Sequence, residues 1–187
     1  MKLIILDRDG VINRESRDFI KTPDEWIPIT ENLEAVARLT KAGYTIVLAT
    51  NQSGLARGLF TLETFEAICA KLHTTVEALG GKIHKIYYCP HGPNDNCSCR
   101  KPKPGMFEQI EQDFQIKLPE IGAIFVGDSL RDVEVGLATG CKVYLVTGAY
   151  GDGQHTLTEL SAEQKRHVTP IETLKVLADE LTSKAPA

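Results

Sequence analysis

Three aspartates follow short apolar runs in the sequence and could share one metal ion. Asp7 and Asp9 come directly after the run 2–6, and Asp128 comes directly after the run 123–127. A glycine behind Asp9 allows the chain to turn, so that both neighbouring carboxylates can face one point. Carboxylate oxygens are ligands that suit Mg²⁺, so the pattern predicts a magnesium site. For any single one of these residues, a solvated strand end or a helix cap is the alternative.

A second group of metal-ligand residues lies within one loop. Cys89, His91, Cys97 and Cys99 follow the pattern Cys-x-His, five residues, Cys-x-Cys. Three thiolates and one imidazole make a closed tetrahedral set for structural Zn²⁺, with no position left for a reacting water. The loop, 89–99, contains little apolar surface, so a metal would organise it in place of a core. Free thiols, or a strained disulfide between Cys97 and Cys99, are the alternatives.

The elements that must position these residues alternate between strand and helix. Short apolar runs predict buried strands at 2–6, 44–50, 85–88, 123–127 and 142–146. Helical spacing and end signals predict helices at 31–42, 61–79, 105–115, 130–139 and 170–182. This alternation predicts an α/β fold with a doubly wound parallel sheet. Ligands of such sheets bind at the carboxyl ends of the strands, which is where the polar segments fall: 7–10, 50–53 and 127–132.

Length and composition limit the classes of protein that the chain can represent. Its 187 residues, 42% hydrophobic and 25% charged, predict one globular domain over 1–187. The net charge of −4 provides no cationic field for nucleic acid or an anionic membrane. No apolar run reaches the roughly 18 residues of a membrane span, and the N-terminus lacks a signal peptide's apolar region. We expect a cytoplasmic monomer without nucleic-acid or membrane partners, and a flexible tail at about 183–187.

Four sequence blocks carry a resemblance to a known family. In chain order, LDRDGVIN, ATNQSG, RKPKPG and GDSLRD resemble the four motifs of the haloacid dehalogenase superfamily of phosphatases. The resemblance implies a Rossmann-like fold, and the short intervals between the motifs leave no room for a large cap domain. It also implies that Asp7 attacks phosphorus to form an aspartyl-phosphate, while Asp9 protonates the leaving oxygen and later activates water. Mg²⁺ would be held by Asp7, Asp128 and the backbone carbonyl of Asp9.

The remaining motif residues are implied in binding the substrate. Those expected to hold its phosphate or its sugar are Thr50, Asn51, Gln52, Ser53, Arg100 and Lys101. Thr50 would offer its hydroxyl and Asn51 its backbone N–H to phosphoryl oxygens, while Lys101 supplies compensating charge. Arg100 would grip the substrate. Because Cys99 immediately precedes Arg100, zinc would fix the origin of both basic side chains.

The pattern of the zinc loop is similar to that of two related kinds of phosphatase. One kind removes the 7-phosphate of D-glycero-D-manno-heptose 1,7-bisphosphate, during nucleotide-activated heptose biosynthesis for lipopolysaccharide core or surface glycans. The other kind acts on histidinol phosphate. The blocks MKLIILDRDGVIN and CPHGP…CRKPKPGMF favour the small sugar bisphosphate as substrate. The short five-residue spacer in the zinc loop keeps histidinol phosphate as the alternative.

Other functions and roles stay open at the level of sequence. In the heptose phosphatases the stretch after the first motif contacts the sugar, which maps onto Glu15, Ser16, Arg17 and Asp18. A solvated surface loop is the alternative for this stretch. Arg57 could face a distal phosphate or form a salt bridge, and Ser129 has no assigned contact. A non-catalytic zinc-binding interaction module is the alternative from a different functional class.

Overall fold

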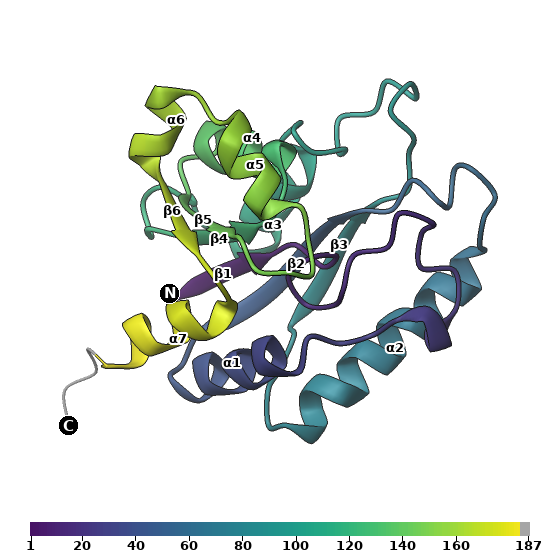
Figure 1. Ribbon diagram of the computed structural model, residues 1–187, viewed down its shortest axis with the longest axis horizontal. Helices are drawn as coiled ribbons and strands as arrows, with labels where there is room; N and C mark the ends of the chain where they lie inside the picture. Colours follow the sequence, from purple (N-terminus) through teal and green to yellow (C-terminus); the bar gives the residue numbers. More distant parts are fainter. Residues whose placement is uncertain (184–187) are drawn as a thin grey trace.

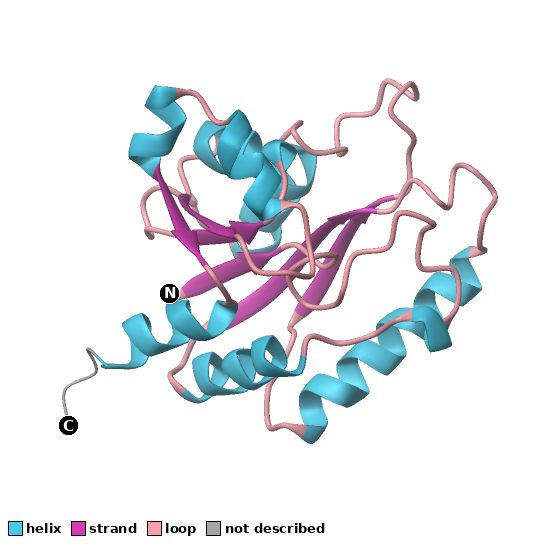
Figure 2. Ribbon diagram, viewed as in Figure 1, coloured by secondary structure: helices cyan, strands magenta, loops and turns pink. Residues whose placement is uncertain are grey.

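Six parallel strands form one sheet through the centre of the molecule (Figures 1 and 2). The structure is a computed structural model, and it describes residues 1–183. The sheet order is β3-β2-β1-β4-β5-β6. Leu3 pairs with Thr45 on one side of the first strand, and Ile4 pairs with Ile124 on the other. The strands are β1 (Leu3–Leu6), β2 (Thr45–Asn51), β3 (Lys85–Cys89), β4 (Ile124–Gly127), β5 (Lys142–Val146) and β6 (Val168–Ile171).

Helices cover both faces of the sheet (Figure 1). One face carries α1 (Thr30–Lys41), α2 (Leu62–Ala78) and α7 (Leu174–Ser183). The other carries α3 (Gly105–Phe114), α4 (Leu130–Ala138), α5 (Gly153–Glu159) and α6 (Ala162–His167), while the short turn η1 (Pro23–Glu25) precedes α1. Successive residues of β1 point to opposite faces, so Ile4 and Leu6 join one apolar core and Leu3 and Ile5 the other. Burial on both faces explains why the strands read as continuous apolar runs.

The order of the strands predicts where a ligand would bind: at the carboxyl ends of the two central strands, β1 and β4. From β1 the chain winds outward to β2 and β3, and it then returns to the other side of β1 to form β4, β5 and β6. The connections that follow β1 and β4 therefore leave in opposite directions. Ligands of open α/β sheets bind at such a switch point, at the carboxyl ends of the strands. The polar segments 7–10 and 127–132 follow these two neighbouring strands.

The structure confirms the predicted doubly wound sheet and all five predicted strands. It adds β6, which the sequence pattern does not indicate, and α7 begins at Leu174 rather than at 170. β6 contains Pro170, and a proline within a short run is a signal against a strand. β6 is nevertheless an edge strand of the sheet, where a proline is tolerated. The helices α5 and α6 and the turn η1 are also absent from the prediction, because such short elements show too little periodicity.

The sequence also predicts that the chain has no cap domain and no membrane-spanning segment, and that its C-terminal tail is flexible. Within residues 1–183 no cap domain is inserted between the motifs, as expected. Across the same residues, no helix combines the length and the apolar character that crossing a membrane requires. Residues 184–187, which make up most of the predicted flexible tail, lie outside the described residues. The assignment of 1–187 to one domain stays a prediction.

Candidate active site

The end of β1 carries the two predicted carboxylates. Asp7 continues the strand ladder, since its N–H donates to the Val126 carbonyl at 2.8 Å, and its side chain is buried. Gly10 then takes a left-handed backbone conformation, with a φ of 79°. A Cβ at Gly10 would overlap the carboxylate of Asp128, so only glycine lets the chain turn here. The turn brings Asp7, Asp9 and Asp128 to one cavity, as the sequence predicts.

Asp128 stands at the end of β4 between two close backbone segments. A Cβ at Gly151 would overlap its carboxylate, as a Cβ at Gly10 would. The N–H of Asp152 donates to Asp128 Oδ2 at 2.8 Å, so the loop after β5 fixes this side chain. Burial, and next the charge of Asp132, raise the pKa of Asp128 well above its usual value.

A buried lysine lies against the same carboxylates. Lys101 Nζ is 3.0 Å from Asp7 Oδ1 and 2.7 Å from Asp132 Oδ1, and it donates to the Ala49 carbonyl at 2.8 Å. Burial favours the neutral amine, but the carboxylates of Asp132 and Asp7 outweigh it and raise the pKa of Lys101. A charged ammonium group is therefore held beside the predicted nucleophile.

Asp132 is a site residue that the sequence analysis does not single out. Its Oδ2 accepts hydrogen bonds from the N–H groups of Asp128 and Ser129, at 3.2 Å and 3.1 Å, and from the Ser129 hydroxyl at 2.8 Å. Burial opposes its ionisation, but Lys101 holds the pKa of Asp132 below its usual value. Ser129 caps α4 in a capping box with Asp132, which gives it a structural contact. The available signal was the four-residue spacing within GDSLRD, which is about one helical turn.

The end of β2 supports both Lys101 and Asp9. Asn51 clamps the Lys101 backbone, since its Oδ1 accepts the N–H at 3.0 Å and its Nδ2 donates to the carbonyl at 3.1 Å. Gln52 Nε2 donates to Thr50 Oγ1 at 2.9 Å and to Asp9 Oδ2 at 3.1 Å. Three of the four residues predicted to bind phosphate in the segment 50–53 are buried: Thr50, Gln52 and Ser53. Their contacts with a phosphate stay predictions, while Asn51 lines the cavity.

Carboxylates dominate the lining of the cavity, whose volume is about 70 Å³. It is formed by Asp7, Asp9, Glu15, Asn51, Lys101, Asp128, Ser129, Arg131 and Asp152. Glu15 is exposed over much of its surface but lines the cavity, where partial desolvation, and next the charge of Asp9, raise its pKa to about 7. Glu15 is thus the member of the predicted sugar-contact stretch that reaches the cavity. The contacts of the exposed residues Ser16, Arg17 and Asp18 with a sugar stay predictions.

The donor chemistry of this cavity fits a divalent cation. Burial, and next Asp132, raise the pKa of Asp7, and carboxylates that share one cavity disfavour each other's ionised form. A bound divalent cation reverses that effect, and oxygen ligands suit Mg²⁺. Ligand atoms of Asp7, Asp128 and Asp132 lie within 4.8 Å of one another. Because Lys101 and Ser129 engage the oxygens of Asp132, Asp7 and Asp128 are the carboxylates that fit such an ion.

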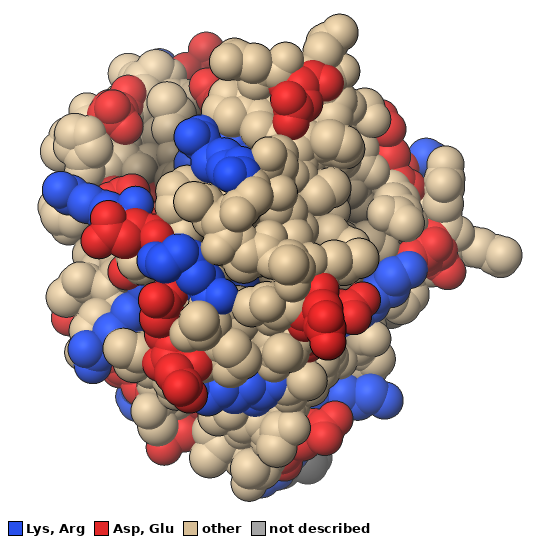
Figure 3. Space-filling model, turned by 90° about the vertical axis from the view of Figure 1, so that its right-hand side faces the viewer, with Lys and Arg blue, Asp and Glu red and all other residues tan. Residues whose placement is uncertain are grey.

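A second pocket of about 310 Å³ lies beside the cavity and is basic. It shares Lys101 and Arg131 with the cavity, and it adds Arg100 and Lys103. Burial, next Arg131 and more weakly Arg57, lower the pKa of Arg100. Like charges this close repel each other, and a bound anion relieves the repulsion. The face that carries the loops after β2 and β3 otherwise has basic and acidic side chains interspersed (Figure 3).

The loop after β3 brings its four ligand-type side chains together. Donor atoms of Cys89, His91, Cys97 and Cys99 all lie within 4.8 Å of one another. Cys89 Sγ is 3.7 Å from Cys97 Sγ and 3.6 Å from His91 Nδ1. Tetrahedral Zn–S bonds of about 2.3 Å require a ligand spacing of roughly 3.8 Å, which these two distances match. Cys99 Sγ lies closer, 2.8 Å from Cys89 Sγ and 3.3 Å from His91 Nδ1. Among the described residues, which include all five cysteines, every cysteine is free. The structure therefore contains no Cys97–Cys99 disulfide, and the cluster is consistent with a structural zinc site.

The zinc loop is tied to the basic pocket by hydrogen bonds. Arg100 Nη1 donates to the His91 carbonyl at 3.4 Å, and Lys103 Nζ donates to the Cys97 carbonyl at 2.6 Å. The backbone of Cys99 leads directly into Arg100. The loop therefore contacts two of the basic side chains directly, while its role in fixing the positions of Arg100 and Lys101 stays a prediction.

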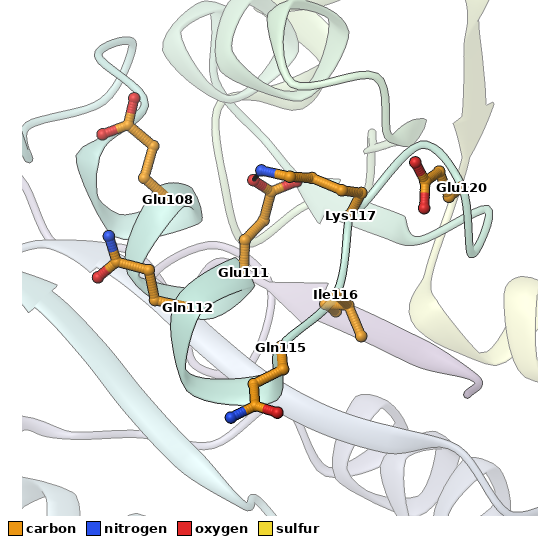
Figure 4. Close-up of a pocket in the computed structure, with 7 residues that line it drawn as sticks. All are labelled: Glu108, Glu111, Gln112, Gln115, Ile116, Lys117 and Glu120. Carbon is orange, nitrogen blue, oxygen red and sulfur yellow. Dashed lines mark hydrogen bonds and ion pairs between the residues drawn. The ribbon is translucent and has the colours of Figure 1, made fainter.

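A larger depression of about 520 Å³ lies along α3 and the segment 115–120 (Figure 4). This segment leads into the amino end of β4, whereas the carboxylates lie at the carboxyl ends of the strands. The depression and the carboxylates are therefore at opposite ends of the strands. Glu111 pairs with Lys117 at 2.8 Å across it and also accepts the N–H of Leu118. A solvated ion pair of this kind carries no chemistry, so the smaller cavity is the candidate active site.

The sheet order, the carboxylates after β1 and β4 and the buried lysine beside them define a domain of the haloacid dehalogenase superfamily. A family model described as polynucleotide kinase 3 phosphatase matches residues 2–152. The D-glycero-β-D-manno-heptose-1,7-bisphosphate 7-phosphatase of Bordetella bronchiseptica is 48% identical, over 99% of this chain and 100% of its own length. The chain belongs to this family of phosphatases.

One further relative and one solved structure also match most of the chain. The phosphatase of the same name from Pseudomonas putida is 52% identical, over 84% of this chain and 87% of its own length. A crystal structure of the B. bronchiseptica D,D-heptose 1,7-bisphosphate phosphatase, complexed with magnesium and phosphate, superimposes with a TM-score of 0.91. The match covers 99% of this chain and 100% of that one at 46% identity. The fold and the whole described site thus lie within the matched region.

Proposed function

We propose that this protein is a Mg²⁺-dependent phosphatase that hydrolyses the 7-phosphate of D-glycero-β-D-manno-heptose 1,7-bisphosphate. The observation that carries the proposal is buried Lys101, which is held against Asp7 in a cavity that Asp128 also lines. Relatives that match nearly the whole chain are named for this reaction. A non-catalytic zinc-binding module would have no use for this buried arrangement of charges, which costs free energy to assemble.

The first chemical step transfers the phosphoryl group to Asp7. Mg²⁺ bound by Asp7, Asp128 and the Asp9 carbonyl would neutralise the oxygens of the transferred phosphate. In the structure Asp7 Oδ1 accepts the Arg8 N–H at 2.7 Å and lies 3.0 Å from Lys101 Nζ. One of the two carboxylate oxygens would hold the metal ion, and the other attacks phosphorus. A bond forms between this oxygen and phosphorus while the bond from phosphorus to the sugar oxygen breaks. Asp9 gives its proton to the departing sugar oxygen.

The second step hydrolyses the aspartyl-phosphate. Asp9, now ionised, takes a proton from a water molecule whose oxygen attacks phosphorus. The bond between phosphorus and Asp7 breaks, which releases inorganic phosphate and restores the Asp7 carboxylate. Lys101 stays charged and fixed by Asp132 and the Ala49 carbonyl, so it balances the negative charge in both steps.

The basic pocket supports a substrate with a second phosphate. Arg100 and Arg131 repel each other in that pocket, and an anionic group would relieve the repulsion. Histidinol phosphate carries an ammonium group and an imidazole in place of a second phosphate. The arginines would repel that ammonium, so the pocket favours the sugar bisphosphate over histidinol phosphate.

Replacing Arg131 tests this assignment of the substrate. We expect Arg131→Gln to raise KM for heptose 1,7-bisphosphate about 10- to 100-fold, because a hydrogen bond to a charged group contributes about 1.5–3 kcal/mol. Because Arg131 also lines the active-site cavity, KM for heptose 7-phosphate should rise as well, but at least about threefold less than KM for the bisphosphate. Phosphate release with Mg²⁺ is measured on both sugars, on histidinol phosphate and on a 3′-phosphorylated oligonucleotide.

The control for this experiment is Arg38→Gln, which changes an exposed arginine on α1. Equal changes in KM for the two sugar phosphates would remove the basic pocket from the substrate site. A wild-type preference for histidinol phosphate or for the oligonucleotide would overturn the proposed substrate.

The role of zinc is tested by Cys99→Ser. We expect this variant to lose zinc and to lower kcat/KM about 10- to 100-fold, because the loop then no longer fixes Arg100 and Lys101. The sheet should stay folded, since Cys89 at the end of β3 is the only strand residue in the loop, and added Mg²⁺ should not restore activity. Elemental analysis, circular dichroism and kinetics are compared with Cys69→Ser, a cysteine on α2. Zinc loss with unchanged kinetics would show that the loop organises itself.

Three expectations complete the proposal. A place in nucleotide-activated heptose biosynthesis for lipopolysaccharide core or surface glycans follows from the proposed substrate. Cytoplasmic location and a monomeric state stay predictions from the sequence.

A further inference from the structure

Arg8 is a buried charged residue, and its side chain has no part in the proposed chemical steps. It stands between Asp7 and Asp9 in the sequence, and its side chain is only 1% exposed. Arginine is almost never fully buried unless it is paired. Its Cζ lies 6.0 Å from the centre of the Phe65 ring, and within residues 1–183 its Nη1 has no hydrogen-bond partner. A buried donor without a partner costs folding free energy, a cost that residues with a functional role often carry.

The guanidinium of Arg8 grips Asp9 through two nitrogens. Nε donates to Asp9 Oδ1 at 3.0 Å, and Nη2 donates to Oδ1 at 2.8 Å and to Oδ2 at 3.1 Å. A planar guanidinium in this arrangement fixes the plane of the carboxylate, whereas a lysine would act as a point charge. The Asp9 side chain is 24% exposed and lines the cavity. The same carboxylate is therefore held from the interior and open to the substrate.

Two neutral side chains complete the hold on Asp9. Asn13 Nδ2 donates to Asp9 Oδ1 at 2.9 Å, and Asn13 Oδ1 accepts the indole N–H of Trp26 at 3.0 Å. Gln52 Nε2 donates to Asp9 Oδ2 at 3.1 Å, and Gln52 Oε1 accepts from Arg8 Nη2 at 3.3 Å. Both carboxylate oxygens thus have buried partners. The carboxylate cannot rotate without breaking charge-assisted hydrogen bonds.

We infer that Arg8 is a positioning residue that orients Asp9 for proton transfer, an inference that rests on the proposed phosphatase function. Asp9 must deliver a proton to the leaving sugar oxygen and then remove one from water at nearly the same place. A carboxylate fixed before the substrate arrives needs no reorientation in either step. Arg8 acts through Asp9 and does not line the cavity that receives the phosphate.

Arg8→Met tests the inference with two leaving groups. A p-nitrophenolate ion departs without a proton, whereas the sugar oxygen needs one. We expect kcat/KM for heptose 1,7-bisphosphate to fall about 10- to 100-fold, and kcat/KM for p-nitrophenyl phosphate to fall by no more than about threefold. Arg8→Lys keeps the charge without the planar contact, and it should show the same selective loss.

A double-variant cycle separates positioning from a merely structural role. In the Asp9→Asn background, Arg8→Met should cause no further loss, because the proton donor is already gone. Circular dichroism and zinc content report folding, and Arg38→Met is the matched surface control. If Arg8→Met does not fold, the same pair of substrates decides the question with Arg8→Lys.

The outcomes separate this inference from the proposed function. Equal losses on both substrates, or an additive loss in the Asp9→Asn background, would overturn the role of Arg8 and leave the phosphatase activity standing. No release of phosphate by the wild-type protein from either ester would overturn the proposed function itself.

Discussion

Asp7→Asn is expected to lower kcat for phosphate release by at least about 10³-fold while the protein stays folded and keeps its zinc. The amide has nearly the same shape as the carboxylate but no nucleophilic oxygen. Its carbonyl can still face Lys101, whose Nζ is 3.0 Å from Asp7 Oδ1. Steady-state kinetics with Mg²⁺, circular dichroism and zinc analysis measure the three quantities on one preparation.

Asp24→Asn provides the matched control for this variant. Asp24 is an exposed aspartate in η1, so the same chemical change there should leave kcat within about twofold. A rapid-mixing experiment with p-nitrophenyl phosphate adds a direct reading, because Asp7→Asn should show no burst of p-nitrophenol. Turnover near the wild-type rate in Asp7→Asn would exclude Asp7 as the nucleophile.

The positions of the principal carboxylates could be predicted from the sequence because they follow from the topology of the sheet. Asp7, Asp9 and Asp128 each follow an apolar run, and the carboxyl ends of parallel strands meet at one edge. The zinc ligands could be predicted for a different reason. Their spacing within one loop brings donor atoms together with few long-range contacts, so local sequence is sufficient.

The supporting residues of the site could not be predicted, because their contacts join segments far apart in the chain. Asn51 holds the backbone of Lys101, and Lys101 in turn bridges Asp7 and Asp132. None of these pairings follows from a periodic pattern or from spacing. The local signal for Asp132, its four-residue spacing from Asp128, is weak because an acidic residue in the first turn of a helix is common.

Arg8 shows a similar limit for a residue inside a motif. The motif places Arg8 between two aspartates, but the direction of its side chain depends on contacts with Gln52 and Phe65. Gln52 lies in the loop between β2 and α2, and Phe65 lies in α2. Sequence reasoning identifies which residue types can do chemistry. The tertiary structure decides which side chains face the substrate and which hold those that do.

Lys101→Met is expected to lower both activity and stability. kcat/KM should fall about 10²- to 10³-fold, because the charge that balances the transferred phosphate is lost. The free energy of unfolding should fall by about 3–5 kcal/mol, because Asp7 and Asp132 remain buried without their cation. Chemical denaturation and phosphate-release kinetics measure the two effects, both with Mg²⁺ at a fixed concentration.

A second substitution separates the two effects of losing Lys101. In Lys101→Met/Asp132→Asn one of the uncompensated charges is gone, so part of the lost stability should return. Activity should not return, because the Lys101 ammonium group that balances the charge of the transferred phosphate is still missing. Lys117→Met, which breaks an exposed ion pair with Glu111, should change stability by no more than about 1 kcal/mol and leave activity unchanged. If activity recovered together with stability in the double variant, Lys101 would act only by holding the site together, and the charge-balancing role proposed for it would be wrong.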